Sequence, residues 1–285
     1  MRPFRIEDEL ARGRVVIVAG YQGMSYRREI TTLGRGGSDT TAVALAAALG
    51  AERCEIYSDV DGVYSADPRV VPEARHIAAM GYEELQEMAE AGAKVLNAEA
   101  VAFAKKERIA IHARRTSDPP DMQGARETVV REDAPREAIG VRAVVGDTQV
   151  ALVRAEDVTD ESLANVLRMA DEAQVPLKEL RVDGGRLSAV VSLLRVPDWE
   201  RARRMLESVG VTTASPGDEN AVATVALVGD GLTQDGRVLR GALDGLREER
   251  VSAQEITATP FRVSAVVAAE RCDDVTRRWH ARFCG

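Results

Sequence analysis

The second half of the chain contains an internal repeat, which limits the possible folds more than any other feature of the sequence. The segment Val150-Ala-Leu-Val153 recurs as Val225-Ala-Leu-Val228, and Leu187-Ser-Ala-Val-Val191 recurs as Val263-Ser-Ala-Val-Val267 at nearly the same offset. Chance similarity between two β-rich segments would not be expected to preserve this spacing twice. We therefore interpret the pattern as a duplicated structural unit.

Each copy of the repeat predicts the order strand, helix, strand, strand, helix, which is the ferredoxin-like plan. Pro197 is expected at the first position of its helix, because the N–H that proline lacks has no partner there. The predicted helices are 160–173, 197–209, 235–248 and 272–282, and the additional strands are 177–182 and 251–257.

The first half of the chain predicts an α/β layer. Residues 14–20 form a continuous apolar run that ends in a glycine, which is typical of a buried parallel strand. The order of elements, β-α-β-α-α-β, favours an α/β layer with parallel strands. The polar, proline-containing stretch 114–137 places a domain boundary near residue 136. The predicted helices are 4–12, 41–49, 82–95, which Gly92 could break, and 97–106, capped by Asn97; the predicted strands are 14–20, 54–57 and 109–113.

A glycine-rich turn precedes the helix 41–49. Gly34, Gly36 and Gly37 allow the backbone to approach a ligand or to take positive φ. Ser38-Asp39-Thr40 then open the helix, and Gly50 closes it. Free N–H groups and the helix dipole point at such a turn, so it is a candidate anion site. The spacing matches neither a Walker A loop nor the Rossmann pattern, and a simple tight turn stays open as the alternative.

Composition excludes several classes of protein. The formal net charge is -8 and the pI is about 5.2, so the chain lacks the basic balance of a general nucleic-acid binder. The three cysteines and three histidines are scattered, without disulfide-framework or metal-ligand spacing. No apolar run approaches the ~18 residues of a membrane span, and the acidic N-terminus is unlike a signal peptide. We expect a cytoplasmic protein with no nucleic-acid partner, membrane partner or metal site.

Three segments, in this order and spacing, resemble the aspartate kinases of the amino-acid kinase family. They are Ile30-Thr-Thr-Leu-Gly-Arg-Gly-Gly-Ser-Asp39, Glu55-Ile-Tyr-Ser-Asp-Val-Asp-Gly-Val-Tyr-Ser-Ala-Asp-Pro-Arg69 and Glu87-Met-Ala-Glu-Ala-Gly-Ala-Lys-Val-Leu96. The C-terminal repeat is similar to the tandem ACT domains that those kinases carry as a regulatory half. The resemblance implies the C-terminal part of an amino-acid kinase domain at 1–136, with a doubly wound, mainly parallel sheet, followed by ACT domains at 137–215 and 216–285.

The resemblance also implies an activity. Aspartate kinases transfer the γ-phosphoryl group of ATP to the β-carboxylate of L-aspartate, the first step towards lysine, threonine and methionine. Such chemistry works mainly through positioning and charge neutralisation. ATP with Mg²⁺, a homodimer formed through the ACT domains, and lysine or threonine as an effector are implied by the resemblance alone.

Four residues at matching positions would form the aspartate site. Arg35 would pair with a carboxylate of aspartate, for which its planar guanidinium is suited. Ser38 would hydrogen-bond the substrate, and Asp39 would organise the site from the start of the helix. Tyr21 would place an aromatic ring against the substrate. The alternative for Arg35 and Asp39 is a local ion pair that braces the loop.

Five further residues would bind the nucleotide by the same resemblance. Ser58, Asp59 and Tyr64 would line the adenine and ribose pocket. Arg69 and Lys94 would contact the phosphates. The alternatives are that Tyr64 is an ordinary core residue and that Lys94 is a solvated cation at a helix end.

The chain departs from the family at its start. Aspartate kinases carry a further stretch with a Lys-Phe-Gly-Gly motif, whose lysine stabilises the transferring phosphoryl group. That motif does not occur in this sequence, so we expect about half of the kinase domain here and a much slower reaction from this chain alone. Three explanations stay open: a shortened form of a longer chain, a second kinase chain that completes the site, and self-association through an exposed sheet edge.

The regulatory half also departs from the family. The loops 154–160 and 229–236 lack the Pro-Gly of the family's effector sites, and Val175-Pro-Leu-Lys-Glu179 replaces its effector segment. We therefore assign no effector residues. In the kinase half, Leu96-Asn97-Ala98-Glu99 replaces the family's Leu-His-Pro-Arg, so we assign no further phosphate contact after Lys94. A second hypothesis is a non-catalytic regulatory chain that binds an amino acid, oligomerises and docks on a complete kinase.

Overall fold

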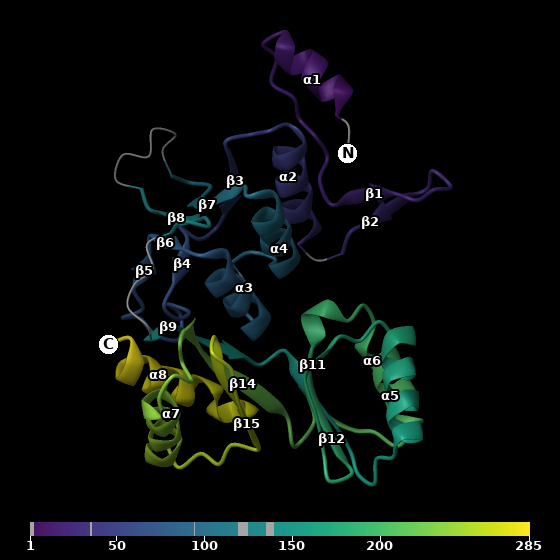
Figure 1. Ribbon diagram of the computed structural model, residues 1–285, viewed down its shortest axis with the longest axis vertical. Helices are drawn as coiled ribbons and strands as arrows, with labels where there is room; N and C mark the ends of the chain where they lie inside the picture. The colour runs from purple at the N-terminus through teal and green to yellow at the C-terminus, as the bar shows by residue number, and fades with distance from the viewer. Residues whose placement is uncertain (1–2, 35, 94, 119–124, 135–139) are drawn as a thin grey trace. The chain divides into compact units, whose positions relative to one another are not determined.

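The computed structural model describes residues 3–34, 36–93, 95–118, 125–134 and 140–285 (Figure 1). The chain divides into two compact units. The first unit comprises residues 1–143 with 228–231 and 284, and the second comprises 144–227 with 232–283 and 285.

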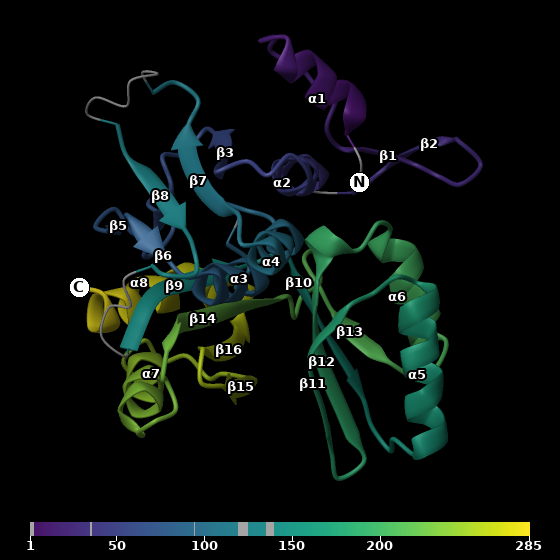
Figure 2. The ribbon, with the colours of Figure 1, turned by 45° about the horizontal axis from the view of Figure 1, so that its top comes forward.

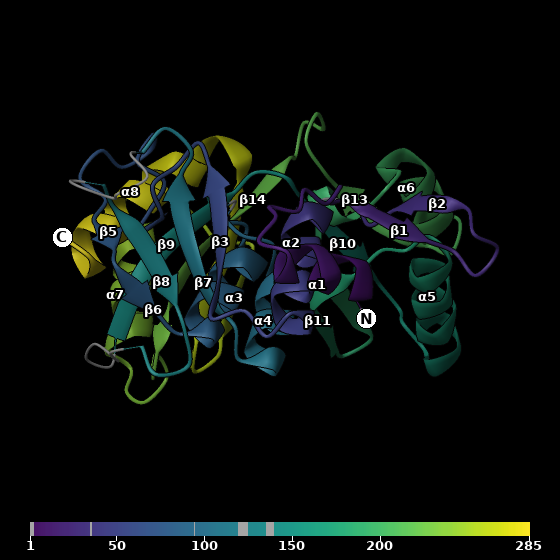
Figure 3. The same ribbon diagram turned by 90° about the horizontal axis from the view of Figure 1, so that it is seen from above.

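The first unit is built on a four-stranded mixed sheet with the order β3-β7-β8-β6. Strands β3 and β7 are parallel and lie side by side in Figure 3, whereas β8 is antiparallel to β7. Alternation along the strands turns Cys54 and Ile111 towards the core and Glu55 and Arg114 to the opposite, polar face. The strands of this sheet are β3 (Arg53–Ser58), β6 (Ala79–Met80), β7 (Ala110–Arg115) and β8 (Glu127–Val130). Between β3 and β6 the chain forms a separate two-stranded pair, β4 (Val63–Tyr64) with β5 (His76–Ile77). The parallel pair expected from 54–57 and 109–113 is confirmed.

Three helices supply the rest of this core. Helix α2 (Gly37–Ala48) packs against α4 (Ala98–Glu107) and β3, and α3 (Tyr82–Ala91) packs against α4. Helix α2 ends as predicted, since Gly50 takes a φ of 61° and its N–H donates to Ala47 O at 3.2 Å. Helix α3 stops before Gly92, which takes a φ of 115°.

The prediction of a buried strand at 14–20 is wrong. This segment follows α1 (Phe4–Ala11) and has no regular secondary structure; its Val15 and Ile17 are 93% and 95% exposed. A strand exists only when a neighbour supplies ladder hydrogen bonds, and none of the described segments pairs with 14–20. The chain instead forms an unpredicted hairpin, β1 (Gln22–Met24) with β2 (Ile30–Thr32).

The second unit confirms the duplicated ferredoxin-like plan. The sheet orders, β11-β12-β10-β13 and β15-β16-β14-β9, place corresponding strands at corresponding positions. Figures 1 and 2 show α5 and α6 on one face of the first repeat's sheet, where Val153, Val166 and Leu206 are buried together. The elements are β10 (Val150–Ala155), α5 (Asp160–Glu172), β11 (Leu177–Asp183), β12 (Arg186–Ser192), α6 (Trp199–Glu207), β13 (Thr212–Ala214), β14 (Val222–Asp230), α7 (Arg237–Glu248), β15 (Glu255–Ala258), β16 (Arg262–Ala268) and α8 (Cys272–Phe283).

One detail of this unit differs from the sequence-based expectation, and another was not predicted. Asp198 caps α6, so Pro197 lies before the helix and not at its first position. Strand β9 (Gly140–Asp147) precedes the first repeat in the chain but forms the edge of the second repeat's sheet, beside β14. The domain boundaries at 137–215 and 216–285 stay a prediction. By chain order β9 belongs to the first of these ranges, but it lies in the sheet of the second repeat.

Candidate functional site

The glycine-rich turn at the start of α2 has a backbone that favours glycine. Gly34 and Gly36 take φ values of 82° and 75°, in the left-handed region. A Cβ atom added to Gly37 would lie 2.7 Å from the Cβ atom of Leu33. Gly34 and Gly36 therefore allow the left-handed backbone of the turn, and Gly37 allows the side chain of Leu33 to pack closely against α2. Arg35 lies outside the described residues.

Tyr21 is held against the start of α2. Its N–H donates to Thr41 Oγ1 at 3.3 Å, and its carbonyl accepts the N–H of Leu33 at 3.0 Å. Its ring edge lies 3.3 Å from the position that a Cβ atom on Gly37 would occupy, while the side chain stays 45% exposed. Tyr21, Ser38 and Asp39 are thus brought together at one helix N-terminus, with an exposed aromatic ring beside it.

Asp39 is a partly buried carboxylate in this group. Burial raises its pKa, although hydrogen bonds from Asn97 and Ser38 oppose the shift. The N–H of Asn97 donates to Asp39 Oδ2 at 3.4 Å, and the Ser38 hydroxyl lies 3.5 Å from Oδ1. The folded chain therefore holds a carboxylate where its charge is poorly solvated. The contact between Asn97 and Asp39 was not predicted from the sequence.

Ser58 and Asp59 lie where the parallel strands β3 and β7 end. The carbonyl of Ser58 accepts the N–H of Thr116 at 2.8 Å, and its hydroxyl accepts the N–H of Val60 at 3.3 Å. Ligands of α/β sheets bind at the carboxyl ends of parallel strands. The position of Ser58 and Asp59 is therefore suited to ligand binding.

Tyr64 belongs to a polar cluster. Its hydroxyl donates to Asp61 Oδ1 at 2.9 Å, Arg115 pairs with the same oxygen at 3.4 Å, and the ring of His76 meets it edge-on at 5.4 Å. Burial disfavours the charge of Asp61, but the hydrogen bond from Tyr64 and the charge of Arg115 outweigh it and lower the pKa of Asp61. Asp61, Arg115 and His76 were not singled out from the sequence, although Asp61 lies within the second motif.

Arg69 extends from this region into solvent. It pairs with Asp67 through Nη2–Oδ2 at 2.6 Å and Nε–Oδ1 at 3.0 Å, and its side chain is 82% exposed. The hydrogen bonds from Arg69 to Asp67 raise the pKa of Arg69. Lys94 lies outside the described residues. The contacts above form two groups, one around Tyr21, Ser38 and Asp39 and one at the end of β3.

The polar face of the sheet carries an acid–base network. Arg114 pairs with Glu55 at 2.9 Å and with Glu127 at 2.7 Å, and Glu127 also meets His112 at 3.0 Å. For Glu127, burial opposes ionisation, but the hydrogen bonds from Arg114 and His112 outweigh it and lower its pKa. The hydrogen bond from Tyr57 lowers the pKa of Glu55.

We expect Glu127→Gln to reduce the acid sensitivity of the first unit. A carboxyl group with a depressed pKa in the folded state stabilises the fold above its unfolded pKa of about 4.3, and this stabilisation is lost as pH falls through the folded value. The variant should be about 1 kcal/mol less stable at pH 7 and closer to the wild type at pH 3. Hydrogen exchange of peptides from β7 and β8 across this pH range measures the difference. A constant difference at all pH values would contradict the assigned charge interaction.

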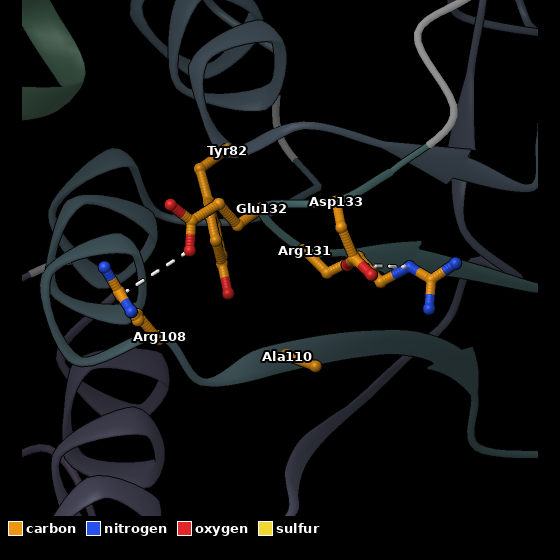
Figure 4. A pocket seen from close by; sticks show the side chains of 6 residues that line it. All are labelled: Tyr82, Arg108, Ala110, Arg131, Glu132 and Asp133. Atoms are coloured by element: carbon orange, nitrogen blue, oxygen red, sulfur yellow. Dashed lines mark ion pairs between the residues drawn. The ribbon is translucent and has the colours of Figure 1, made fainter.

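A shallow pocket lies elsewhere in the first unit, at the amino end of β7 (Figure 4). Its volume is about 350 Å³, and its charged side chains pair with one another, Arg108 with Glu132 at 3.5 Å and Arg131 with Asp133 at 3.5 Å. No predicted site residue lines it. It is lined by Tyr82, Arg108, Ala110, Arg131, Glu132 and Asp133.

Among the described residues, no three His, Cys, Asp or Glu side chains are grouped so that they could hold a metal ion. None of the helices that the structure describes is long and apolar enough to cross a bilayer.

The chain is similar to aspartokinases in sequence. The model of the amino acid kinase family matches residues 4–114. The aspartokinase of Mycolicibacterium smegmatis is 34% identical over 295 residues, covering 99% of this chain and 68% of that protein. The aspartokinase of Thermus thermophilus is 32% identical over 289 residues, covering 99% of this chain and 70% of that protein.

The chain is also similar to aspartokinases in fold. E. coli aspartokinase III in complex with aspartate and ADP matches with a TM-score of 0.83 and 25% identity, covering 98% of this chain and 64% of that one. The aspartate kinase of Clostridium acetobutylicum matches with a TM-score of 0.76 and 20% identity, covering 98% of this chain and 66% of that one, which shows the fold alone. The chain thus spans about two thirds of the length of these relatives.

Proposed function

Because this chain belongs to the aspartokinase family, we propose that it binds L-aspartate at the start of α2 and acts in the ATP-dependent phosphorylation of its β-carboxylate. In this reaction a β-carboxylate oxygen forms a bond to the γ-phosphorus, the bond from that phosphorus to the β–γ bridging oxygen breaks, and ADP leaves. The products are aspartyl phosphate and ADP.

The observation that carries this proposal is the convergence of Tyr21, Ser38 and Asp39 at the first turn of α2. The helix N-terminus presents N–H groups and a positive dipole end, both of which favour a carboxylate of the substrate. The α-ammonium of aspartate is its one positively charged group, and the carboxylate of Asp39 suits it. Ser38 and Arg35 are proposed to complete the recognition of the substrate carboxylates.

The nucleotide would lie at the carboxyl end of β3. Ser58, Asp59 and Tyr64 are proposed for the adenine and ribose, with Asp61 fixing the hydroxyl of Tyr64 at 2.9 Å. Arg69 and Lys94 are proposed for the phosphates. Arg69 would exchange its exposed pair with Asp67 for a phosphate, which an exposed ion pair permits at little free-energy cost. Phosphoryl transfer from ATP uses Mg²⁺; the described side chains form no metal site, so the ion enters this proposal only with the nucleotide.

We also propose a regulatory role for the second unit and a partner for the first. E. coli aspartokinase III has been solved with lysine and aspartate. By the family resemblance we propose lysine or threonine as the effector of the two ferredoxin-like repeats and a homodimer as the assembly. Val15 and Ile17, nearly fully exposed on a segment without strand partners among the described residues, favour a further kinase segment, from this or a second chain, that pairs with 14–20.

The test is formation of aspartyl phosphate, trapped as a hydroxamate by hydroxylamine, with ADP release measured in parallel. Signal that requires both ATP and aspartate, and is absent with asparagine, is the expected result. Calorimetric titration with aspartate follows binding separately. If neither binding nor hydroxamate is detected, the proposal is wrong. If no hydroxamate forms but lysine or threonine raises the melting temperature, the chain is a regulatory subunit instead.

A further inference from the structure

We infer that Asn97 is a positioning residue for the substrate end of this site, linking the start of α4 to Gly36 and Asp39 at the start of α2. The inference rests on the proposed function for its consequence in aspartate binding. The linkage itself rests only on the contacts of Asn97.

Three different parts of Asn97 make these contacts. Its backbone N–H donates to Asp39 Oδ2 at 3.4 Å. Its side-chain Oδ1 accepts the N–H groups of Glu99 at 2.8 Å and Ala100 at 3.2 Å, which caps α4. The body of its side chain fills the space beside Gly36, where an added Cβ atom would lie 2.3 Å from Nδ2 and 2.5 Å from Cβ of Asn97.

The cap and the contact with Asp39 depend on each other. The two capping bonds fix the backbone of Asn97 at a φ of -73° and a ψ of 130°, and that conformation sets the direction of its N–H. The same helix end presents the positive pole of α4 to the Asp39 carboxylate. A residue that caps equally well should therefore keep Asp39 in place, and a residue that cannot cap should release it.

Gly36 completes the linkage from the other side. It is the N-cap of α2 and takes a φ of 75°. A side chain at this position would clash with Asn97 and would also strain the backbone. The conformation of the turn and the position of the cap therefore depend on each other. Asn97 thus contacts the start of α2 and caps the start of α4. Ser38 and Asp39 lie in the first turn of α2, so their position depends on this linkage.

The inference predicts different results for three substitutions. Asn97→Ser keeps a capping oxygen and should change the KM for aspartate by no more than about 2-fold. Asn97→Ala removes the cap and should raise the KM for aspartate about 10-fold, with the KM for ATP unchanged. Asn97→Asp keeps the cap but adds a negative charge near Asp39, and should raise the titration midpoint of Asp39 by about 1 pH unit.

The decisive readout is independent of activity. Carboxyl ¹³C NMR of labelled aspartate residues follows the titration of Asp39, whose signal is identified by its loss in Asp39→Asn. The matched control is Asn220→Asp, an exposed turn residue of the second unit, which should leave that midpoint unchanged. An Asp39 midpoint that ignores Asn97→Asp overturns the linkage. A midpoint that moves while aspartate affinity is the same in all variants supports the linkage and refutes the proposed substrate site.

Discussion

Replacing Asp39 by asparagine is expected to weaken aspartate binding by about 10- to 100-fold and to make the first unit more stable at pH 7. Loss of binding follows because the neutral amide cannot pair with the α-ammonium of aspartate, a charged hydrogen bond of about 1.5–3 kcal/mol. The gain in stability follows from burial, which raises the pKa of Asp39. Affinity is measured by calorimetry and stability by hydrogen exchange of peptides from α2.

The pH dependence of this gain has a definite sign. A carboxyl group whose pKa is raised by folding destabilises the folded state when it is ionised, and this effect is fully present above the folded pKa. It disappears as pH falls and the carboxyl group takes up a proton. The stabilising effect of Asp39→Asn should therefore be largest near pH 7 and should vanish near pH 3.

Asp61→Asn is the matched control, because the same substitution in the same unit meets the opposite environment. The pKa of Asp61 is lowered, with the hydrogen bond from Tyr64 and the charge of Arg115 outweighing burial. Asp61→Asn should therefore destabilise the unit at pH 7. If Asp39→Asn is also destabilising at pH 7, the Asp39 carboxylate stabilises the fold. The prediction that this carboxylate lowers stability while it favours aspartate binding is then wrong.

The repeat and the helix ends were readable from the sequence because both depend on local information. The paired apolar segments at 150–153 and 225–228 gave the two ferredoxin-like sheets, and Gly50 and Asn97 end and begin helices as expected. The prediction of a strand at 14–20 was wrong because an apolar run shows only that a segment can be buried. A strand also needs a neighbouring strand to supply hydrogen bonds. The position of β9 was not predicted, since no local pattern shows which repeat an edge strand joins.

In the candidate site, too, local features were predictable from the sequence and long-range contacts were not. The positive φ of Gly36 follows from its residue type, and Ser38 and Asp39 lie in the first turn of α2, which begins at Gly37, earlier than the predicted range 41–49. The bond from Asn97 to Asp39 joins residues 58 positions apart, and that from Arg115 to Asp61 joins residues 54 apart. Such contacts follow from packing of α2 on α4 and of β3 on β7, which a single sequence does not encode locally.

Replacing Glu179 by alanine is expected to destabilise the second unit by about 3 kcal/mol. Glu179 lies in β11 of the first repeat, and its carboxylate accepts the hydroxyl of Ser264 at 2.9 and 3.0 Å and pairs with Arg262 at 3.3 Å in β16 of the second repeat. Both charged side chains are largely shielded, at 13% and 15% exposure. Removing one partner of a shielded pair leaves the other charge poorly compensated, which typically costs about 3–5 kcal/mol.

The repeat provides a matched control for this substitution. Arg186, the position equivalent to Arg262, pairs with Glu156 at 3.2 Å, but these side chains are 77% and 70% exposed. Glu156→Ala should therefore change stability by less than about 0.5 kcal/mol. Trp199 and Trp279 are the two tryptophans of the chain and both lie in the second unit, so tryptophan fluorescence during urea unfolding reports on this unit.

A further variant separates the net contribution of the ion pair from the effect of breaking it. Replacing both partners, Glu179→Leu with Arg262→Met, removes both charges together and should recover most of the lost stability, because shielded ion pairs often contribute little net free energy. Equal effects of Glu179→Ala and Glu156→Ala would show that the pair is not shielded in solution. The contact between the two repeats would then depend on its apolar centre, formed by Val150, Leu152, Val190, Ala214, Val222 and Val266.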